Sequence, residues 1–122
     1  MPASQHGSEM DIRVERQDHC TVLHVTGDLD FHGTPLFYTR VDGVGTAGSP
    51  CMVLELSGVR FCDSAGLGAL VYAFNRMKAA NGRLVLVAVP QSLRRRLRIS
   101  GLESHFAFRD TVQEVLPEAG SV

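Results

Sequence analysis

Residues 61–70 read Phe-Cys-Asp-Ser-Ala-Gly-Leu-Gly-Ala-Leu, which predicts the end of a strand, a sharp turn and the start of a helix. Upstream, the apolar run 51–56 has the length and composition of a buried strand. Downstream, apolar residues recur at helical spacing from Leu67 to Met77, and Asn81-Gly82 supplies a C-terminal cap signal. Ser64 stands between the two segments, and serine is favoured at a helix N-cap.

The position of Ser64 has a chemical consequence. The first backbone N–H groups of a helix lack internal partners, and the helix dipole places partial positive charge there. A phosphate on Ser64 would therefore meet an anion site, and Gly66 and Gly68 leave the approach to the hydroxyl open. A purely structural cap explains the spacing as well, because serine caps many ordinary helices.

Three short motifs carry a family resemblance. Residues 63–68, Asp-Ser-Ala-Gly-Leu-Gly, resemble the signature loop of the STAS family (sulfate transporter and anti-sigma factor antagonist domains). Residues 27–30, Gly-Asp-Leu-Asp, resemble its Gly-Glu-Leu-Asp motif, with Asp28 where Glu is commoner, and residues 99–102 resemble its Ser-Gly-Leu segment. The motifs stand in the family order, and the resemblance that they support covers about residues 11 to 116. The chain looks most like the bacterial anti-sigma factor antagonists.

Length and composition indicate one globular domain. The chain has 122 residues, of which 44% are hydrophobic and 20% charged, so it is long enough to bury a core without a disulfide or a metal. The net charge of −1 does not favour nucleic acid or an anionic membrane as a partner. We expect residues 1–10 to be a flexible tail, 11–116 the domain and 117–122 a second tail.

The cysteines and the apolar segments bear on the compartment. Cys20, Cys51 and Cys62 are odd in number and lie in or beside predicted strands, so buried reduced thiols are expected. No stretch resembles a signal peptide or a transmembrane helix. A reducing cytoplasm is the predicted location.

The hydrophobic pattern predicts a single α/β domain. The expected order is strand, strand, helix, strand, helix, strand, helix, strand, helix, with helices capped by Thr34, Ser64, Ser92 and Asp110. A short link after residue 16 predicts an antiparallel hairpin, and the later alternation predicts parallel pairing. The sheet is therefore mixed. The resemblance implies about five strands and about four helices, gathered mainly on one side.

The resemblance also assigns the site. In the antagonists, the serine directly after the Asp accepts phosphate, and Ser64 holds that place. Ala65 stands where relatives often have Ser or Thr, so no second acceptor follows. Small residues on the outward face of the helix would form a shelf for a partner. The predicted partner-binding residues are Asp28, Asp30, Asp63, Ser64, Ala65, Gly66, Leu67, Gly68, Ala69, Ala73 and Arg76.

The sequence gives weaker support to a metal site, a catalytic site or a basic binding surface. Asp28, Asp30, His32 and His24 match no established metal-ligand spacing, so no metal is expected. The nucleophile-elbow pattern Gly-x-Ser-x-Gly is absent, because Cys62 stands at its first position, and no catalytic set can be named. The arginines of 94–98 are exposed helix surface or a site for an acidic patch on a partner.

The predicted function is that of a regulatory binding module and not of an enzyme. The resemblance implies that the unphosphorylated form binds an anti-sigma factor that is also a serine kinase of the histidine-kinase-like ATPase type, and so releases the sigma factor. Phosphorylation at Ser64 would end binding, and a serine phosphatase would reset it. No cofactor, nucleic acid or membrane is implied, and the chain would be a monomer or a weak dimer. A STAS scaffold or transporter-accessory subunit that is not phosphorylated remains an alternative, as does nucleotide or small-ligand sensing at the same loop.

Overall fold

The elements of the chain follow the predicted order. The computed structural model describes residues 9–46 and 50–120, so most of the predicted N-terminal tail lies outside the described residues. A short 3-10 turn, η2, covers Glu103–His105. The strands are β1 (Asp11–Gln17), β2 (Cys20–Leu29), β3 (Cys51–Cys62), β4 (Arg83–Val87) and β5 (Ala107–Arg109), and the α-helices are α1 (Thr34–Asp42), α2 (Ser64–Ala79), α3 (Gln91–Ile99) and α4 (Val112–Gly120).

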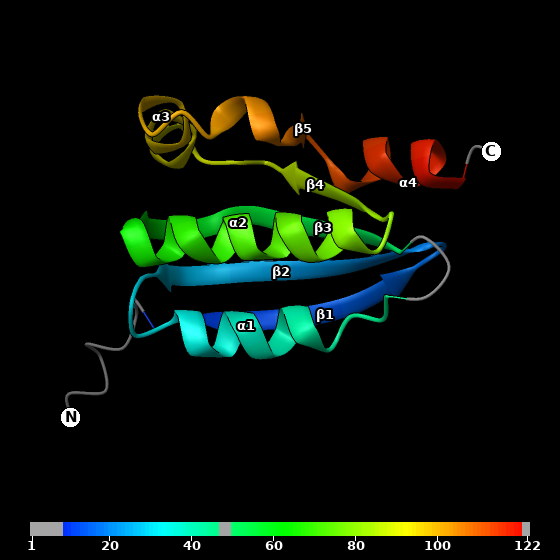
Figure 1. Cartoon of the computed structure of the whole chain (residues 1–122), viewed down its shortest axis with the longest axis horizontal. Coiled ribbons are helices and arrows are strands. Elements are labelled where there is room, and N and C mark those ends of the chain that lie inside the picture. The colour runs from blue at the N-terminus through cyan, green and yellow to red at the C-terminus, as the bar shows by residue number, and fades with distance from the viewer. Residues whose placement is uncertain (1–8, 47–49, 121–122) are drawn as a thin grey trace.

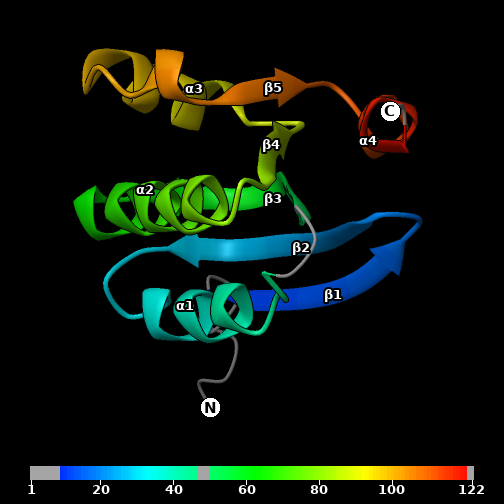
Figure 2. The same cartoon turned by 45° about the vertical axis from the view of Figure 1, so that its right-hand side comes forward.

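The five strands form one mixed sheet in the order β1-β2-β3-β4-β5 (Figure 1). β1 is antiparallel to β2, and every later pairing is parallel, which confirms the predicted hairpin and crossovers. Because each parallel strand is added on the same side of its predecessor, right-handed crossovers place α1, α2 and α3 on one face. Figure 2 shows α4 apart from these three helices. The predicted α/β class and the gathering of helices mainly on one side are confirmed.

Each face of the sheet has its own apolar core. The larger core joins the sheet to α1, α2 and α3, and fully buried members include Leu23, Phe37, Leu70 and Leu97. On the opposite face, a smaller core lies between α4 and the strands β2, β3 and β4; its buried members are Cys20, Val22, Cys51, Val53, Val85, Val87, Val112 and Val115. The parallel strands are thus covered on both faces, as their aliphatic composition requires.

The cysteines depart from the prediction. Cys20 and Cys51 are partners in the parallel register of β2 and β3, and a disulfide joins them. The prediction of three reduced thiols is therefore wrong for this pair, because strand register brings together two residues that are 31 positions apart. Cys62 is free and buried, as predicted.

Two strands run further than the apolar pattern indicated. β2 continues to Leu29, so the Gly-Asp-Leu-Asp motif of residues 27–30 begins within a strand. Gly27 has a φ of +96°, which glycine adopts without strain, and the pairing with β3 shifts register on both sides of it. β3 likewise continues to Cys62. The longer strands deliver residues 28–30 and 62–64 to the same edge of the sheet.

The predicted N-caps of α1 and α3 are wrong. Thr34 lies inside α1, and its hydroxyl donates to the Phe31 carbonyl while Gly33 holds the cap position. Pro90, not Ser92, precedes α3. At α1 two capping residue types, Gly33 and Thr34, are adjacent, whereas the N-cap position of α3 lies two residues before Ser92 and has no side-chain cap.

The last helix differs from its prediction at both ends. The Thr111 hydroxyl accepts from the amide of Glu114, and the Glu114 carboxylate accepts from the amide of Asp110, which together make a reciprocal cap. Asp110 is therefore not the cap. The helix continues through Pro117 to Gly120, so that part of the predicted C-terminal tail is helical.

Helix α3 ends in a left-handed glycine cap. Gly101 has a φ of +78°, and the amide of Leu102 donates to the carbonyl of Leu97 at 2.8 Å.

Among the helices of the described residues, none combines the length and the apolar character that a transmembrane span needs.

Candidate functional site

The turn between β3 and α2 is organised by Asp63, and the prediction that Ser64 caps this helix is wrong. Asp63 is the N-cap, with extended backbone, and its Oδ1 accepts from the amide of Gly66 at 3.0 Å. Its other oxygen, Oδ2, accepts from the amide of Phe31 at 3.1 Å. The carboxylate therefore holds together the start of α2 and the loop that follows β2. The amide of Gly66, with a smaller contribution from Phe31, lowers the pKa of Asp63 from its ordinary value.

Ser64 is the first residue of α2 and is exposed. Its hydroxyl makes no hydrogen bond within the described part of the chain, so nothing there competes with an incoming reactant. The predicted cluster of vacant amides is only partly present, because Asp63 already occupies the amide of Gly66 and the Asp63 carbonyl accepts from Leu67. The site thus offers an open hydroxyl beside a carboxylate.

Two exposed aromatic side chains flank this turn, and neither was predicted from the sequence to have a role. Phe31, whose amide binds Asp63, is 71% exposed, and Phe61, at the end of β3, is 47% exposed. Large exposed apolar side chains beside a polar centre are typical of protein contact surfaces. Their positions in the sequence could have indicated that they are exposed. Phe31 lies in a turn-forming loop, and Phe61 precedes the buried Cys62 in a strand, where successive side chains point to opposite faces.

The loop before α1 is rigid through Asp30. Its Oδ1 accepts from the amide of Gly33 at 2.8 Å, and its carbonyl accepts from the amides of Gly33 and Thr34. Asp28 is half-buried near the end of β2. Asp28 thus lies at the end of the strand that leads into the loop joined to Asp63, and Asp30 lies in that loop as a turn-forming residue.

The predicted shelf of small residues on α2 is wrong. Gly66, Ala69 and Ala73 are buried against the sheet. An added Cβ at Gly66 would lie 2.0 Å from the Leu29 carbonyl oxygen, which shows how closely the helix approaches β2. The small side chains bring the helix near the sheet and do not form a surface for a partner.

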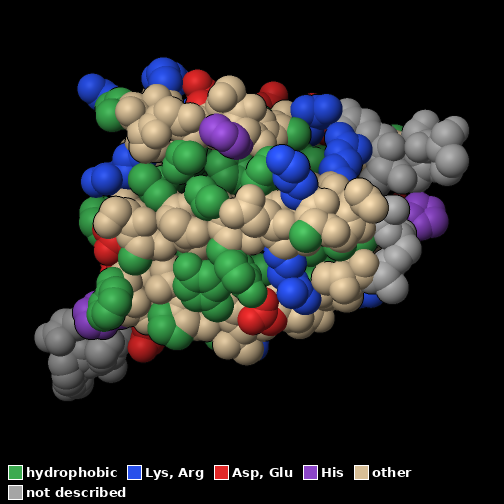
Figure 3. Space-filling view, in the orientation of Figure 1, with side chains coloured by type: hydrophobic (Ala, Val, Ile, Leu, Met, Phe, Trp, Pro, Cys, Tyr) green, Lys and Arg blue, Asp and Glu red, His purple; other side chains and the backbone are tan. Residues whose placement is uncertain are grey.

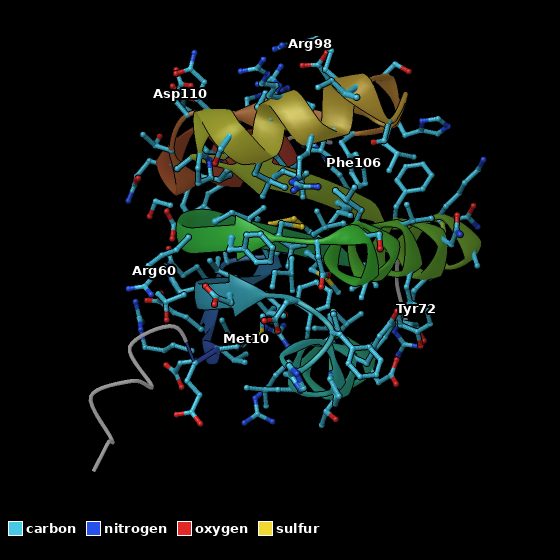
Figure 4. The ribbon with its side chains drawn as sticks, turned by 90° about the vertical axis from the view of Figure 1, so that its left-hand side faces the viewer. Met10, Arg60, Tyr72, Arg98, Phe106 and Asp110 are labelled. Carbon is cyan, nitrogen blue, oxygen red and sulfur yellow. A yellow bond between two sulfur atoms is a disulfide. The ribbon has the colours of Figure 1, made fainter. Side chains whose placement is uncertain are left out.

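The remaining predicted contact residues divide into two groups. Gly68 is exposed, and Ala65 and Leu67 are half-buried beside Ser64. Arg76 lies three turns further along, about 18 Å from Ser64 by the helical rise. Its guanidinium donates to the carbonyls of Asp42 and Val44 at 3.0 and 3.3 Å, so it binds the end of α1. Figure 4 shows Tyr72, which donates to the Asp42 carboxylate, in the same seam between α1 and α2.

His24 and Cys62 occupy structural positions in the sheet. His24 contacts Glu15 on β1, with 2.9 Å between Nε2 and Oε1, and is a cross-strand residue. Within the described residues there is no group of three His, Cys, Asp or Glu side chains that could hold a metal ion. Burial, with a contribution from Asp63, raises the pKa of Cys62 to about 12, so this thiol is neutral and a poor nucleophile.

Comparison with known proteins fits this arrangement of strands, helices and turn. The model of the STAS domain matches residues 11–115. The chain belongs to the STAS domain family. The anti-sigma F factor antagonist of Paenibacillus polymyxa is 27% identical over 112 residues, which are 89% of this chain and 96% of that protein. The STAS fold also matches the crystal structure of an anti-sigma factor antagonist from Mycobacterium paratuberculosis, with a TM-score of 0.79, 27% identity and 92% and 95% of the two chains covered.

A third comparison shows the fold alone. The phosphorylated form of the Bacillus cell fate determinant SpoIIAA superposes with a TM-score of 0.68 and 20% identity, covering 88% of this chain and 98% of that one. The Paenibacillus and Mycobacterium relatives are named as regulatory antagonists and not as enzymes.

The cap made by Asp63 gives a test of the turn. We expect Asp63→Ala to lower the free energy of unfolding by about 1 kcal/mol at pH 7, because the Gly66 amide loses its acceptor. Since the folded pKa is depressed, the carboxylate contributes fully above the unfolded Asp pKa of about 4, and the contribution is lost as pH falls through the folded value. Urea denaturation of both proteins at pH 7 and at acidic pH measures this. A difference that is independent of pH, or absent, would contradict the assignment.

Proposed function

We propose that this STAS protein is an anti-sigma factor antagonist controlled by phosphorylation at Ser64. In its unmodified form it binds an anti-sigma factor that is also a serine kinase of the histidine-kinase-like ATPase type, and the sigma factor is released. The observation that carries the proposal is the exposed Ser64 hydroxyl, which makes no hydrogen bond within the described residues. It lies in the turn that Asp63 joins to the exposed Phe31 and that follows the exposed Phe61. The names of the relatives supply the partner class.

The contact surface proposed for the partner is smaller than the sequence motifs indicated. It is formed by the residues at one edge of the sheet: Asp28, Asp30, Phe31, Phe61, Asp63, Ser64, Ala65, Leu67 and Gly68. Aromatic side chains at its centre would provide most of the binding free energy, since buried aromatic anchors dominate protein interfaces. Arg76 and the buried glycine and alanines of α2 are not part of it.

Phosphorylation would act locally. The Ser64 hydroxyl oxygen attacks the γ-phosphorus of ATP, the bond to ADP breaks and the hydroxyl proton leaves to a base of the kinase. The product carries about −1.5 to −2 charge at neutral pH, next to the carboxylate of Asp63. Burying this charge against a partner without a compensating cation is costly, so the complex dissociates while the antagonist keeps its fold. A serine phosphatase reverses the change, and the cycle takes place in the cytoplasm.

The acceptor is tested by incubating the full chain with ATP, Mg²⁺ and the anti-sigma factor kinases of its source organism, followed by mass spectrometry. We expect one phosphate on wild type and none on Ser64→Ala. Ser92→Ala is the matched control, because Ser92 is also an exposed serine in the first turn of a helix, and it should be modified like wild type. Equal modification of Ser64→Ala would refute the acceptor. No modification by any kinase would favour the STAS scaffold.

Binding is tested with the same kinases by calorimetry. We expect phosphorylated protein to bind at least about 100-fold more weakly than unmodified protein, and Ser64→Asp to bind about 10-fold more weakly, because it carries less charge. Ser57→Asp adds a carboxylate at another exposed serine and should bind like wild type. Unchanged affinity after phosphorylation would refute the switch.

A further inference from the structure

A basic hollow lies between α2 and α3, beside the Ser64 turn. Its lining includes Leu67 from α2 and Ser92, Arg95, Arg96, Arg98 and Ile99 from α3. Arg96 also lines a smaller, adjoining hollow with Phe61 and Cys62, the residues that lead into the turn. Arg96 therefore stands where α3 meets the end of β3.

Ser64 lies about one helical turn before Leu67, a residue of α2 that lines this hollow and is on the same side of the helix. Further along this flank, the ring of Phe74 packs on Phe106, with 5.7 Å between ring centroids. The opposite flank carries Tyr72 and Arg76 and contacts α1. Hydrophobic side chains are visible along both flanks in the space-filling view of this face (Figure 3).

The arginines of α3 differ in their partners. Glu103 pairs with Arg94 at 2.7 Å and with Arg98 at 3.5 Å, and Arg94 also lies over the ring of Phe108. Within the described part of the chain, neither Arg95 nor Arg96 pairs with a carboxylate. The guanidinium of Arg96 lies 5.9 Å from the centroid of the Phe61 ring, a contact that leaves its donors available. Two unpaired cations thus border the hollow.

A phosphate on Ser64 would need such cations. The amide of Gly66, which would otherwise bind an anion, is occupied by Asp63, and the Asp63 carboxylate repels a second negative charge. The start of the helix alone therefore does not compensate the dianion. Arginine is the side chain best suited to this, because its planar fork can bind two phosphate oxygens.

We propose that Arg96, supported by Arg95, binds the phosphate of phosphorylated Ser64 within the same chain. The inference rests on the proposed function for its acceptor residue. Unmodified protein presents Arg96 beside the exposed ring of Phe61, whereas phosphorylated protein directs it to its own phosphate. Phosphorylation then adds negative charge to the contact surface and also removes a cation from it.

The test is a phosphorus-31 NMR titration of full-length protein in which phosphoserine is placed at position 64 during synthesis, so that no kinase is needed. A neighbouring guanidinium favours the dianion and lowers the second pKa of the phosphate, which is about 6 without neighbours. At low salt, we expect Arg96→Gln to raise this pKa by about half a pH unit and Arg95→Gln/Arg96→Gln to raise it further. Arg98→Gln is the matched control, because Arg98 lines the same hollow but its guanidinium pairs with Glu103 at 3.5 Å.

The outcomes separate the two proposals. A pKa that rises in Arg96→Gln and not in Arg98→Gln supports the phosphate contact. A pKa unchanged in Arg96→Gln, or raised equally by both substitutions, overturns it, and the proposed function is then unaffected. If instead no kinase modifies Ser64, the proposed function fails while the titration still decides whether Arg96 binds the phosphate. Thermal melts of each variant confirm that the compared proteins are folded.

Discussion

Replacing Gly66 with alanine is expected to lower the free energy of unfolding by about 3 kcal/mol, which is the upper part of the range for overpacked cores. The new Cβ would lie 2.0 Å from the Leu29 carbonyl oxygen and 2.7 Å from Cys62 Sγ. Both distances are far shorter than van der Waals contact, and the nearest atom belongs to the backbone of β2. Either α2 moves outward or β2 yields, and both changes disturb the larger core.

Gly68→Ala is the control for this prediction. Gly68 lies in the same helix, and an added Cβ there has no neighbour within 4 Å. Alanine favours a helix over glycine by about 0.8 to 1 kcal/mol, so this variant should be more stable than wild type. Urea denaturation of the three proteins measures both changes. Equal destabilisation by the two substitutions would show that helix propensity, and not the approach to β2, sets the requirement for glycine at position 66.

Reducing the Cys20–Cys51 disulfide should cost about 3 to 4 kcal/mol of stability, from the chain entropy of a cross-link between residues 31 positions apart. The bond joins the first residues of β2 and β3 in the core under α4, whereas Ser64 follows the last residue of β3. Reduction should therefore lower the denaturation midpoint and leave partner affinity unchanged.

The measurement compares urea denaturation of oxidised protein with and without dithiothreitol, with Cys20→Ser/Cys51→Ser as the variant that lacks the cross-link. Cys62→Ser should retain the response to reductant, because Cys62 takes no part in the bond. A midpoint that does not respond to reductant, together with three titratable thiols in the unfolded protein, would contradict the disulfide.

The order of the elements could be predicted from sequence because hydrophobic periodicity directly reflects burial. The aliphatic run 83–89 indicates a buried strand, and the spacing of Leu93 and Leu97 indicates a helix with one buried side. Neither prediction depends on the rest of the chain. The Cys20–Cys51 pairing could not be predicted in this way. The pairing depends on the register of two strands separated by a helix. The register of parallel strands is set by the packing of the whole domain and not by a short local turn.

The site was predictable in position and not in detail. The motif placed Ser64 at the start of α2, but Asp63 and Ser64 are both good capping residues, and the backbone angles of one residue decided for Asp63. The prediction of which α2 residues are exposed was wrong, because the larger apolar residues were expected to point to the core. In the structure Leu67 and Phe74 face the flank toward α3 and η2, and the smallest residues face the sheet.

The Asp63 carboxylate fixes the relative positions of two segments of the chain. Because the two oxygens of Asp63 bind the amides of Gly66 and Phe31, Ser64, which we propose as the phosphate acceptor, and the loop that carries Phe31 are held in one fixed arrangement. A protein that grips the phenyl ring of residue 31 thereby fixes the orientation of the neighbouring serine toward its own catalytic centre. Recognition and delivery of the substrate hydroxyl would then be a single event.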